Sequence, residues 1–466
     1  MKHATFTGRL VIIGFGSIGQ GVLPLILKHL EVDPAKVTIV TAEERGHGVA
    51  REYGVRFVLK RLTRDNYRDV LSPMLREGDF VVNVSVDVSS LALVELCQEK
   101  GAFYIDTCIE PWAGGYTDTS LSPSLRSNYA LREKALKMRG EGRPTAVLTH
   151  GANPGLVSHL TKKALLTIAA DSGLKAATPT DRAGWAKLMQ TLGVKVVHIA
   201  ERDTQTTARP KPPGEFVNTW SVEGFVGEGL QPAELGWGSH EKELPRNGYR
   251  HEFGRDCAIY IARPGASVRV RSWTPMEGPY QGFLITHSEA ISIADYFTVG
   301  EGADAEFRPT VHYSYHPCDE AVLSLHELAG KGWQFTQKPV VAMEEIAAGN
   351  DELGVLLMGH SQGAYWFGSR LSIGAARRLA PHNNATSLQV TATVLAGMSW
   401  ALENPRRGLV EPEEMDFERI LELAEPYLGT LVGEYSNWTP LEHRAELFDE
   451  DIDREDPWQF KNFLVI

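Results

Sequence analysis

The chain carries Gly14-Phe15-Gly16-Ser17-Ile18-Gly19-Gln20-Gly21 directly after the apolar run Leu10-Val11-Ile12-Ile13. This order predicts a strand, a glycine turn and a helix over residues 18–30, with a bend at Pro24. In a dinucleotide-binding fold, the first glycine makes the tight turn and the second lets the backbone approach a pyrophosphate. The third allows close packing of helix on strand, and the phosphates sit at the helix N-terminus. The stretch therefore predicts an NAD-type cofactor.

Length and composition narrow the class of protein. A chain of 466 residues is long enough for two or three domains. The formal charge is −12 and no cluster of Lys and Arg is long enough to follow a phosphate backbone, so we expect no nucleic acid as partner. The N-terminus has no small-residue cleavage site, and no segment offers about 18 uninterrupted apolar residues, so we expect no membrane association.

The number and spacing of the cysteines indicate the redox state of the cellular compartment. Cys97, Cys108, Cys257 and Cys318 are scattered without a CxxC pair. This spacing argues against a zinc site and against a disulfide framework. We therefore expect no metal, reduced thiols and a cytoplasmic protein.

Further apolar runs predict an α/β fold with a doubly wound, Rossmann-type parallel sheet. Residues 36–40, 80–86, 102–106 and 144–149 are strand candidates that alternate with helical patterns. Ligands of such sheets bind beyond the carboxyl ends of the strands. The loops around Asp87, Glu110 and Asn153 are therefore expected near the nicotinamide. Asn153 and Pro154 are predicted as N-cap and first residue of a helix over residues 156–167.

The loop after the second strand bears on the choice of cofactor. Thr41 and Glu43 lie where the adenosine ribose would be. A carboxylate there accepts a hydrogen bond from a 2′-hydroxyl and repels a 2′-phosphate, so Glu43 favours NAD over NADP. An ordinary solvated loop acid is the alternative.

From about residue 170 the pattern changes to short alternating segments. Residues 194–200, 216–220, 257–261, 267–273 and 282–286 predict a second α+β domain that is mostly antiparallel.

Acids and tryptophans are interleaved within residues 194–240 of this second part. Glu201 and Glu228 could pair with ammonium groups, and the face of Trp220 attracts cations, so the set could bind a polyamine. His287 follows a strand and could move protons near neutral pH, although a purely structural histidine is the alternative. Surface acids are the alternative for Glu201 and Glu228.

A competing motif lies near the C-terminal end. Gly359-His360-Ser361-Gln362-Gly363 fits the G-x-S-x-G nucleophile elbow, with His382, His443, Asp416 and Asp449 available for a triad. A serine hydrolase acting through Ser361 is thus an alternative. Against it, the dinucleotide unit begins at residue 10 and only about 100 residues remain for the triad. We treat Ser361 as a loop residue at a glycine turn, lining the cofactor or an interface.

Several motifs together carry a family resemblance. The runs GFGSIGQG, NVSVDVSS, DTCIEPW, THGANPG, HIAERDTQ to NTWSVEGF, and LMGHSQGAYWFGS closely resemble the bacterial homospermidine synthases. The G-x-N-P-G turn also resembles saccharopine reductases and carboxynorspermidine synthases. The resemblance implies an NAD-binding domain over residues 1–155, completed by about 375–466, and a substrate-binding and dimerisation domain over 156–374. It also implies a homodimer.

The resemblance further implies a reaction without net redox change. Putrescine loses a hydride to NAD, a second putrescine displaces ammonia from the imine, and the Schiff base takes the hydride back. NAD then acts as a prosthetic group. Spermidine is a further possible diamine. The implied roles are amine binding by Glu201 and Glu228, stacking by Trp220, and orientation or proton transfer by Asn153 and His287, with Asp87 and Glu110 near the nicotinamide.

The predicted cofactor-binding residues follow the strand ends and the matched motifs. They are Gly14, Gly16, Ser17, Ile18, Gly19, Thr41, Glu43, Ser85, Val86, Asp87, Thr107, Thr149, Gly151 and Asn153.

Two further alternatives stay open. A saccharopine- or carboxynorspermidine-type reductase would consume NAD(P)H and bind an amino-acid carboxylate, for which clustered arginines are expected, whereas residues 194–240 hold more acids than bases. A non-catalytic NAD-binding sensor is the other alternative, and the acids placed at strand ends argue against it.

Overall fold

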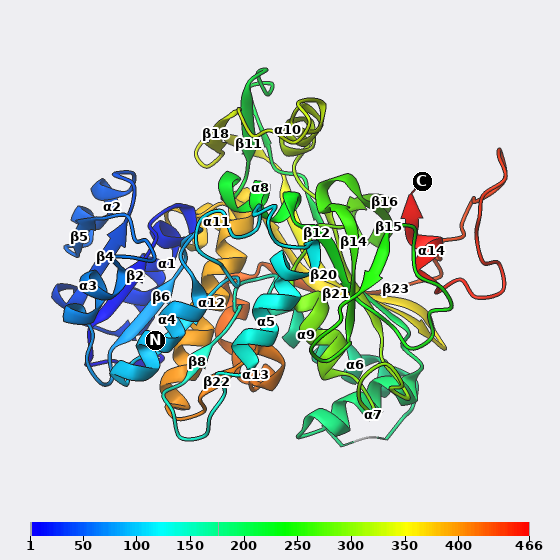
Figure 1. Ribbon diagram of the computed structural model, residues 1–466, viewed down its shortest axis with the longest axis horizontal. Coiled ribbons are helices and arrows are strands. Elements are labelled where there is room, and N and C mark those ends of the chain that lie inside the picture. Colours follow the sequence, from blue (N-terminus) through cyan, green and yellow to red (C-terminus); the bar gives the residue numbers. More distant parts are fainter. Residues whose placement is uncertain (1, 176, 466) are drawn as a thin grey trace.

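Two large sheets lie beside each other and make up most of the molecule (Figure 1). The computed structural model describes residues 2–175 and 177–465. One sheet, blue and cyan in Figure 1, is parallel, and the other, mainly green and yellow, is mostly antiparallel. The predicted fold class is confirmed.

The parallel sheet has the strand order β22-β8-β7-β6-β2-β4-β5. Its strands are β2 (Leu10–Ile13), β4 (Val37–Thr41), β5 (Arg56–Leu59), β6 (Phe80–Asn83), β7 (Phe103–Asp106), β8 (Ala146–Val147) and β22 (Leu409–Val410). Without β22 this is the dinucleotide-binding order 3-2-1-4-5-6. The order reverses between β2 and β6, where such sheets bind their ligands.

Helices cover both faces of this sheet. Leu10 and Ile12 of β2 pack in the same cluster as α1 (Ser17–His29) and α12 (Ala385–Glu403). Val11 and Ile13 point the other way, because side chains alternate along a strand, and pack with α3 (Tyr67–Leu71) and α4 (Ser90–Lys100). The helix predicted after the glycine turn is α1, which continues past Pro24 without interruption.

The second sheet has eleven strands, of which eight follow the order β13-β14-β12-β17-β9-β20-β21-β23. These are β9 (Val196–Asp203), β12 (Pro232–Gly236), β13 (Gly248–Arg250), β14 (Ala258–Pro264), β17 (Thr310–His316), β20 (Asn350–His360), β21 (Gly363–Ser372) and β23 (Thr430–Ser436). Strands β15 (Arg269–Thr274), β16 (Gly278–Phe283) and β24 (Leu464–Val465) complete it. β9 and β17 are parallel, and the other described pairs are antiparallel.

The remaining elements surround the two sheets. The further helices are α2 (His47–Glu52), α5 (Asn128–Leu136), α6 (Leu156–Asp171), α7 (Arg182–Leu192), α8 (Val222–Leu230), α9 (Ser288–Tyr296), α10 (Asp319–Gly330), α11 (Ile373–Leu379), α13 (Phe417–Ala424) and α14 (Phe460–Phe463). Short paired strands are β1 (Ala4–Thr5) with β3 (Leu30–Glu31), β10 (Thr206–Thr207) with β19 (Ile346–Ala348), and β11 (Glu215–Asn218) with β18 (Lys338–Val341). β11, β18 and α10 form an arm at the top of Figure 1.

Helix α12 joins the two sheets. It contacts β7 and β8 on one side and β20 and β21 on the other, and it is buried along almost its whole length. One hydrophobic cluster therefore includes residues of both sheets. Residues 375–466 are divided between them, because β22 extends the parallel sheet whereas β23 and β24 extend the second. The domain limits given above remain a prediction.

The structure removes the basis of one alternative and shows one local expectation to be wrong. Residues Ser361 and Gln362 form the turn of the β20–β21 hairpin, with Gly359 and Gly363 at positive φ, so Ser361 is the loop residue at a glycine turn that was expected, and strand β21 rather than a helix follows it directly. A nucleophile elbow needs a strand followed by a helix, and the motif for a serine hydrolase therefore lacks its structural context. The N-cap of α6 is Gly155, not Asn153.

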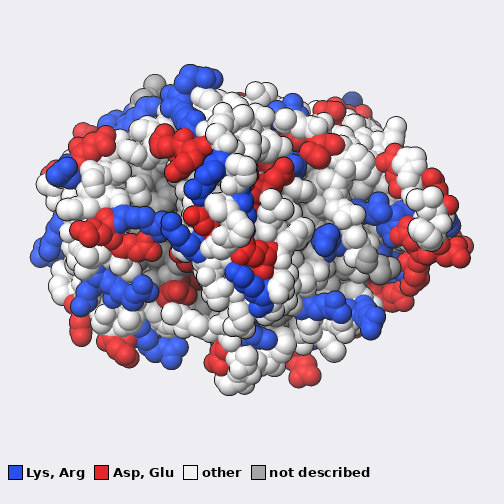
Figure 2. Space-filling model, turned by 90° about the horizontal axis from the view of Figure 1, so that it is seen from above, with Lys and Arg blue, Asp and Glu red and all other residues white. Residues whose placement is uncertain are grey.

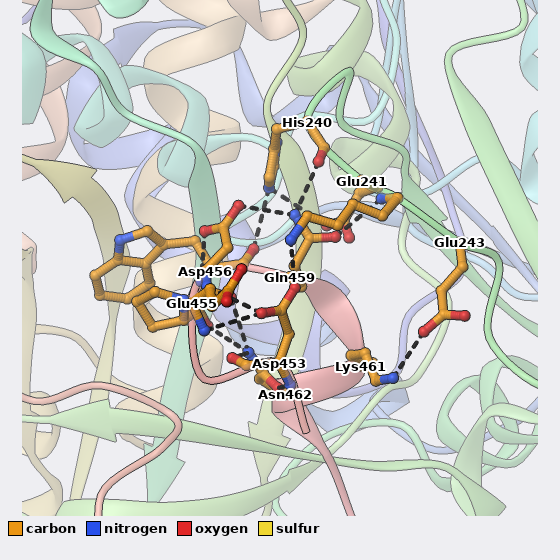
Figure 3. Close-up of polar contacts among 12 residues, drawn as sticks. His240, Glu241, Glu243, Asp453, Glu455, Asp456, Gln459, Lys461 and Asn462 are labelled. Carbon is orange, nitrogen blue, oxygen red and sulfur yellow. Dashed lines mark hydrogen bonds and ion pairs between the residues drawn. The ribbon is translucent and has the colours of Figure 1, made fainter. Parts of the chain in front are cut away.

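The C-terminal segment is attached to a loop before β13. Figure 3 shows residues 240–243 facing residues 453–462. Lys242 Nζ lies 2.5 Å from Asp453 Oδ2, and Gln459 Nε2 donates to the carbonyl oxygen of His240 at 2.8 Å. These contacts hold α14 against the sheet. Figure 2 shows acidic side chains at this end of the molecule. Within the described ranges, no helix has the length and apolar character that crossing a membrane requires.

A buried ion network links the two halves of the molecule. Arg132 of α5, which is 3% exposed, pairs through Nε with Glu411 at 2.6 Å and through Nη2 with Asp295 of α9 at 2.8 Å. Arg182 of α7 also pairs with Asp295 at 2.8 Å. Burial opposes ionisation of Asp295, but the nearby arginines outweigh it and lower its pKa to about 2.

Arg132→Met should lower the free energy of unfolding by about 3 kcal/mol, because two buried carboxylates lose a partner while other arginines remain beside them. Urea unfolding at pH 7 measures this loss. The matched control is Arg419→Met, whose partially exposed ion pairs should contribute less than about 1 kcal/mol. The pKa of Asp295 is lowered by folding, so the effect should shrink below about pH 4. Equal losses in both variants at pH 7 would contradict this role of Arg132.

Candidate active site

The glycine turn has the geometry that a dinucleotide requires. Gly14 has φ +85°, and a Cβ there would lie 2.8 Å from Ser85 Cα. A Cβ at Gly19 would lie 2.6 Å from the carbonyl oxygen of Gly14, so this glycine permits close packing of α1 on the turn. A Cβ at Gly16 would meet no described atom within 4 Å. The open side of the turn is therefore at Gly16, the N-cap of α1.

A cavity of about 430 Å³ lies beyond the carboxyl ends of β2, β4 and β6. This volume is within the usual range of small-molecule sites. Five predicted cofactor-binding residues line it, namely Gly14, Thr41, Ser85, Val86 and Asp87. Lys60, Arg61 and Arg64 also line it and were not predicted, since no local motif marks them.

Glu43 follows Thr41 and Ala42, which line the cavity, but does not itself belong to the described lining. Its carboxylate pairs with Arg45 at 2.6 Å, and both side chains are exposed. A role for Glu43 toward a ribose remains a prediction.

The loop after β8 is fixed by Asp106, a buried residue at the end of β7. The backbone N–H of Thr149 donates to Asp106 Oδ1 at 2.5 Å, and the N–H of His150 donates to its carbonyl oxygen at 2.7 Å. Thr149 has φ +57°. This loop brings Thr149, Gly151 and Asn153 to the carboxyl edge of the parallel sheet, where Thr107 also lies beside Gly151.

Asn153 reaches from this loop to the second sheet. Its Nδ2 donates a hydrogen bond to Glu201 Oε2 at 2.8 Å. The same oxygen accepts a hydrogen bond from the hydroxyl of Tyr313. Glu201 is 2% exposed. Burial raises the pKa of Glu201, the two donors oppose this, and the result is about 7.

His287 lies between two carboxylates. Its Nε2 is 3.0 Å from Glu228 Oε2, and its Nδ1 is 3.1 Å from Glu289 Oε1. Burial disfavours the charged ring, but Glu289 and Glu228 outweigh burial and raise the pKa of His287 well above its ordinary value. The two carboxylates therefore favour the protonated imidazole, and a role of His287 in orienting the amine or moving its proton remains a prediction.

Aromatic rings connect Trp220 with Glu201 and His287. Trp220 Nε1 donates to the hydroxyl of Tyr315 at 3.0 Å. The rings of Tyr315 and Tyr313 are stacked at 5.0 Å with an angle of 9°. Tyr313 also lies against His287, with the ring centroids 4.4 Å apart.

Glu110 is hydrogen-bonded to Asp87, which lines the cavity. The N–H of Asp87 makes a long hydrogen bond of 3.4 Å to Glu110 Oε2, and Cys108 Sγ donates to Oε1 at 3.4 Å. Burial raises the pKa of Glu110 to about 8, and the nearby charge of Glu228 acts in the same direction. Glu110 can therefore exchange a proton near neutral pH.

Hydrogen bonds, an ion pair and ring contacts join five of the seven residues predicted for catalysis, a further hydrogen bond joins the other two, and the charge of Glu228 acts on Glu110. The five are Asn153, Glu201, Trp220, Glu228 and His287, and the other two are Asp87 and Glu110. Sequence reasoning missed Tyr313, Tyr315 and Glu289. The alternation of Tyr313 and Tyr315 along one strand and the place of Glu289 two residues after His287 were the available signals. Among the described residues, no group of three or more His, Cys, Asp and Glu could hold a metal ion.

The strand order, the glycine turn and the adjoining carboxylates define a dinucleotide-dependent enzyme of the saccharopine dehydrogenase class. Residues 10–147 match the family model of the saccharopine dehydrogenase NADP binding domain, and residues 151–436 match that of the saccharopine dehydrogenase C-terminal domain.

Full-length relatives give a narrower assignment. Homospermidine synthase of Blastochloris viridis is 55% identical over 98% of this chain and 97% of the relative, and that of Mesorhizobium japonicum is 52% identical over 99% and 97%. The crystal structure of homospermidine synthase from Legionella pneumophila in complex with NAD is 50% identical, with a TM-score of 0.93 over 99% of this chain and 98% of that one. The chain belongs to the homospermidine synthase family, which confirms the resemblance found in the sequence.

Gly16→Val should lower the affinity for NAD by about 100-fold or more, because the new side chain enters the open space at the turn without a clash inside the protein. Calorimetric titration with NAD measures the affinity, and the melting temperature without cofactor should stay near that of the parent protein. In contrast, Gly19→Val should lower the melting temperature itself, since its Cβ would clash with Gly14. Unchanged NAD affinity in Gly16→Val would contradict this use of the turn.

Proposed function

We propose that this protein is an enzyme that makes homospermidine by transferring an aminobutyl group from one putrescine to a second, with release of ammonia and no net redox change. The observation that carries the proposal is a set of three carboxylates, those of the buried Glu110 and Glu201 and the partly buried Glu228, in a chain similar to homospermidine synthases over its full length. Carboxylates suit the ammonium groups of a diamine.

NAD fits the cavity and the turn. The N–H groups of Ser17, Ile18 and Gly19 at the start of α1 would bind the pyrophosphate, with Gly16 giving it room. Thr41 and Glu43 would face the ribose, while the loops with Ser85, Val86, Thr107, Thr149 and Gly151 would bind the nicotinamide half. When bound, NAD takes a hydride from the first diamine and returns it to the final Schiff base.

Each residue of the site has a proposed role that follows from its charge and hydrogen-bonding groups. Glu201 and Glu228 would bind ammonium ends of the diamines, and His287 would keep Glu228 in place through their 3.0 Å contact. The reacting nitrogen must be neutral when hydride leaves its carbon, and Glu110, with a pKa of about 8, is suited to take that proton. The face of Trp220 would stabilise the cationic imine, and Asn153 would orient the amine beside Glu201.

The two diamines react in a sequence of steps in which atoms and electrons balance. The amine of the second putrescine adds to the imine carbon, and the nitrogen of the first leaves as ammonia. The resulting Schiff base accepts the hydride and a proton to give homospermidine. Water must stay away from the imine meanwhile, because hydrolysis would release an aldehyde. Spermidine is a further possible donor of the aminobutyl group.

The proposal also covers the cellular compartment and the oligomeric state. We infer a cytoplasmic homodimer. The free thiols of Cys97, Cys108, Cys257 and Cys318 support a reducing compartment, and the family resemblance supports the dimer.

The deciding experiment is incubation of the protein with putrescine and catalytic NAD, without added reductant. Homospermidine and ammonia should form in equal amounts with no net NADH. A requirement for one NAD(P)H per product and for an amino-acid substrate would favour the reductase alternative.

Trp220→Ala should lower turnover of putrescine by about 10- to 30-fold, because the cationic imine loses an aromatic face. The content of bound NAD should stay close to that of the parent protein. Trp220→Phe is the matched control: it keeps an aromatic face, loses only the hydrogen bond to Tyr315, and should retain more activity. Equal losses of NAD and of turnover in Trp220→Ala would place this tryptophan at the cofactor instead.

A further inference from the structure

We propose that Tyr313 is a positioning residue of this site, whose hydroxyl keeps Glu201 ionised and whose ring supports the imidazolium of His287. The inference deepens the proposed function and rests on it for its catalytic consequence.

The hydroxyl of Tyr313 faces a carboxylate that would otherwise be poorly stabilised. Both residues are 2% exposed, so water cannot solvate the charge of Glu201. Glu201 Oε2 accepts hydrogen bonds from Tyr313 and from Asn153 Nδ2. Hydrogen bonds to the charged form of a carboxylate favour ionisation, and here the hydroxyl opposes burial more strongly than the amide does.

The other groups around Glu201 come from several elements. Asp203 on β9 and Asp351 on β20 are acids, and both disfavour a charge on Glu201. Tyr315 on β17 and Tyr280 on β16 are also close to it. His287 supplies the positive charge that faces Glu201 and acts with the two hydrogen-bond donors.

Tyr313 itself is suited to donate. Burial and the charge of Glu201 raise the pKa of Tyr313 well above its ordinary value, so its hydroxyl keeps the proton. Its ring lies against His287 at 4.4 Å, while both ring nitrogens of His287 already contact Glu228 and Glu289. The contact of Tyr313 with His287 therefore involves the ring alone. The hydroxyl can be removed without removing that contact.

Tyr313→Phe tests the hydroxyl. The pKa of Glu201 should rise by about one to two units, because an ionic hydrogen bond is lost. Infrared difference spectra recorded as a function of pH report this through the carboxylic acid C=O band, which Glu201→Gln identifies. In wild type the band should appear below about pH 7, and in Tyr313→Phe at correspondingly higher pH.

The kinetic consequence follows from the same shift. If ionised Glu201 binds the diamine, the acid limb of kcat/KM for putrescine should move up by the same one to two units, giving about a 10- to 100-fold loss near neutral pH that recovers in alkali. Tyr129→Phe is the matched control, since it removes an equally buried hydroxyl of α5 that donates to the carbonyl oxygen of Phe253 and is not part of the site. Its acid limb should stay near that of wild type.

The infrared and kinetic results distinguish a failure of the role inferred for Tyr313 from a failure of the proposed function. An unshifted Glu201 band in Tyr313→Phe overturns the inference, even if wild type makes homospermidine. A uniform loss of kcat/KM at every pH overturns it as well, because that pattern indicates a structural role. A shifted band in a protein that makes no homospermidine supports the effect of Tyr313 on Glu201 and overturns the proposed reaction.

Discussion

The parallel pairing of β9 with β17 is the constraint on which the candidate site depends. In this register Glu201 lies opposite Tyr315, and His198 lies opposite His312. Since side chains alternate along a strand, Glu201 and Tyr313 share one face of the sheet, while the ring centroids of the two histidines lie 4.0 Å apart on the other. A shift by one residue would exchange the faces and turn the carboxylate toward the apolar residues of α14.

On the face of the sheet that carries Glu201 and Tyr313, burial raises the free energy of each ionised side chain and leaves it in need of a partner of opposite charge. An ionised side chain in a dry interior needs partners, and here His287 and the hydroxyl of Tyr313 supply some of them. They do not supply enough, because Glu201, Glu228 and Glu289 outnumber the single imidazolium that faces them. The excess of negative charge is what a diammonium ligand would complement. The same burial holds Glu110 and Glu201 near pKa 8 and 7, where both proton states are accessible.

The sequence predicts some parts of this arrangement better than others. The glycine turn, α1 and the parallel strands depend on neighbouring residues, so local patterns were sufficient for them. The pairing of Glu201 with Tyr313 spans 112 positions and depends on sheet register, which no local pattern encodes. The same limit explains why the hydrolase alternative at Ser361 stayed open: a glycine turn after an apolar run is common to an elbow and to a hairpin, and only the partner strand distinguishes them.

The relative position of the two sheets matters for the proposed chemistry as much as either sheet alone. Asp87 and Glu110 follow strands of the parallel sheet, whereas Glu201 belongs to the second, and Asn153 spans the gap between them. Helix α12 packs against both sheets within one core, which resists movement of one relative to the other. In a reaction in which the hydride is transferred to the cofactor and back again, the imine must stay bound in one position until the amine of the second diamine reacts with it. A fixed geometry between cofactor edge and carboxylates therefore suits this reaction better than sheets that separate during each turnover.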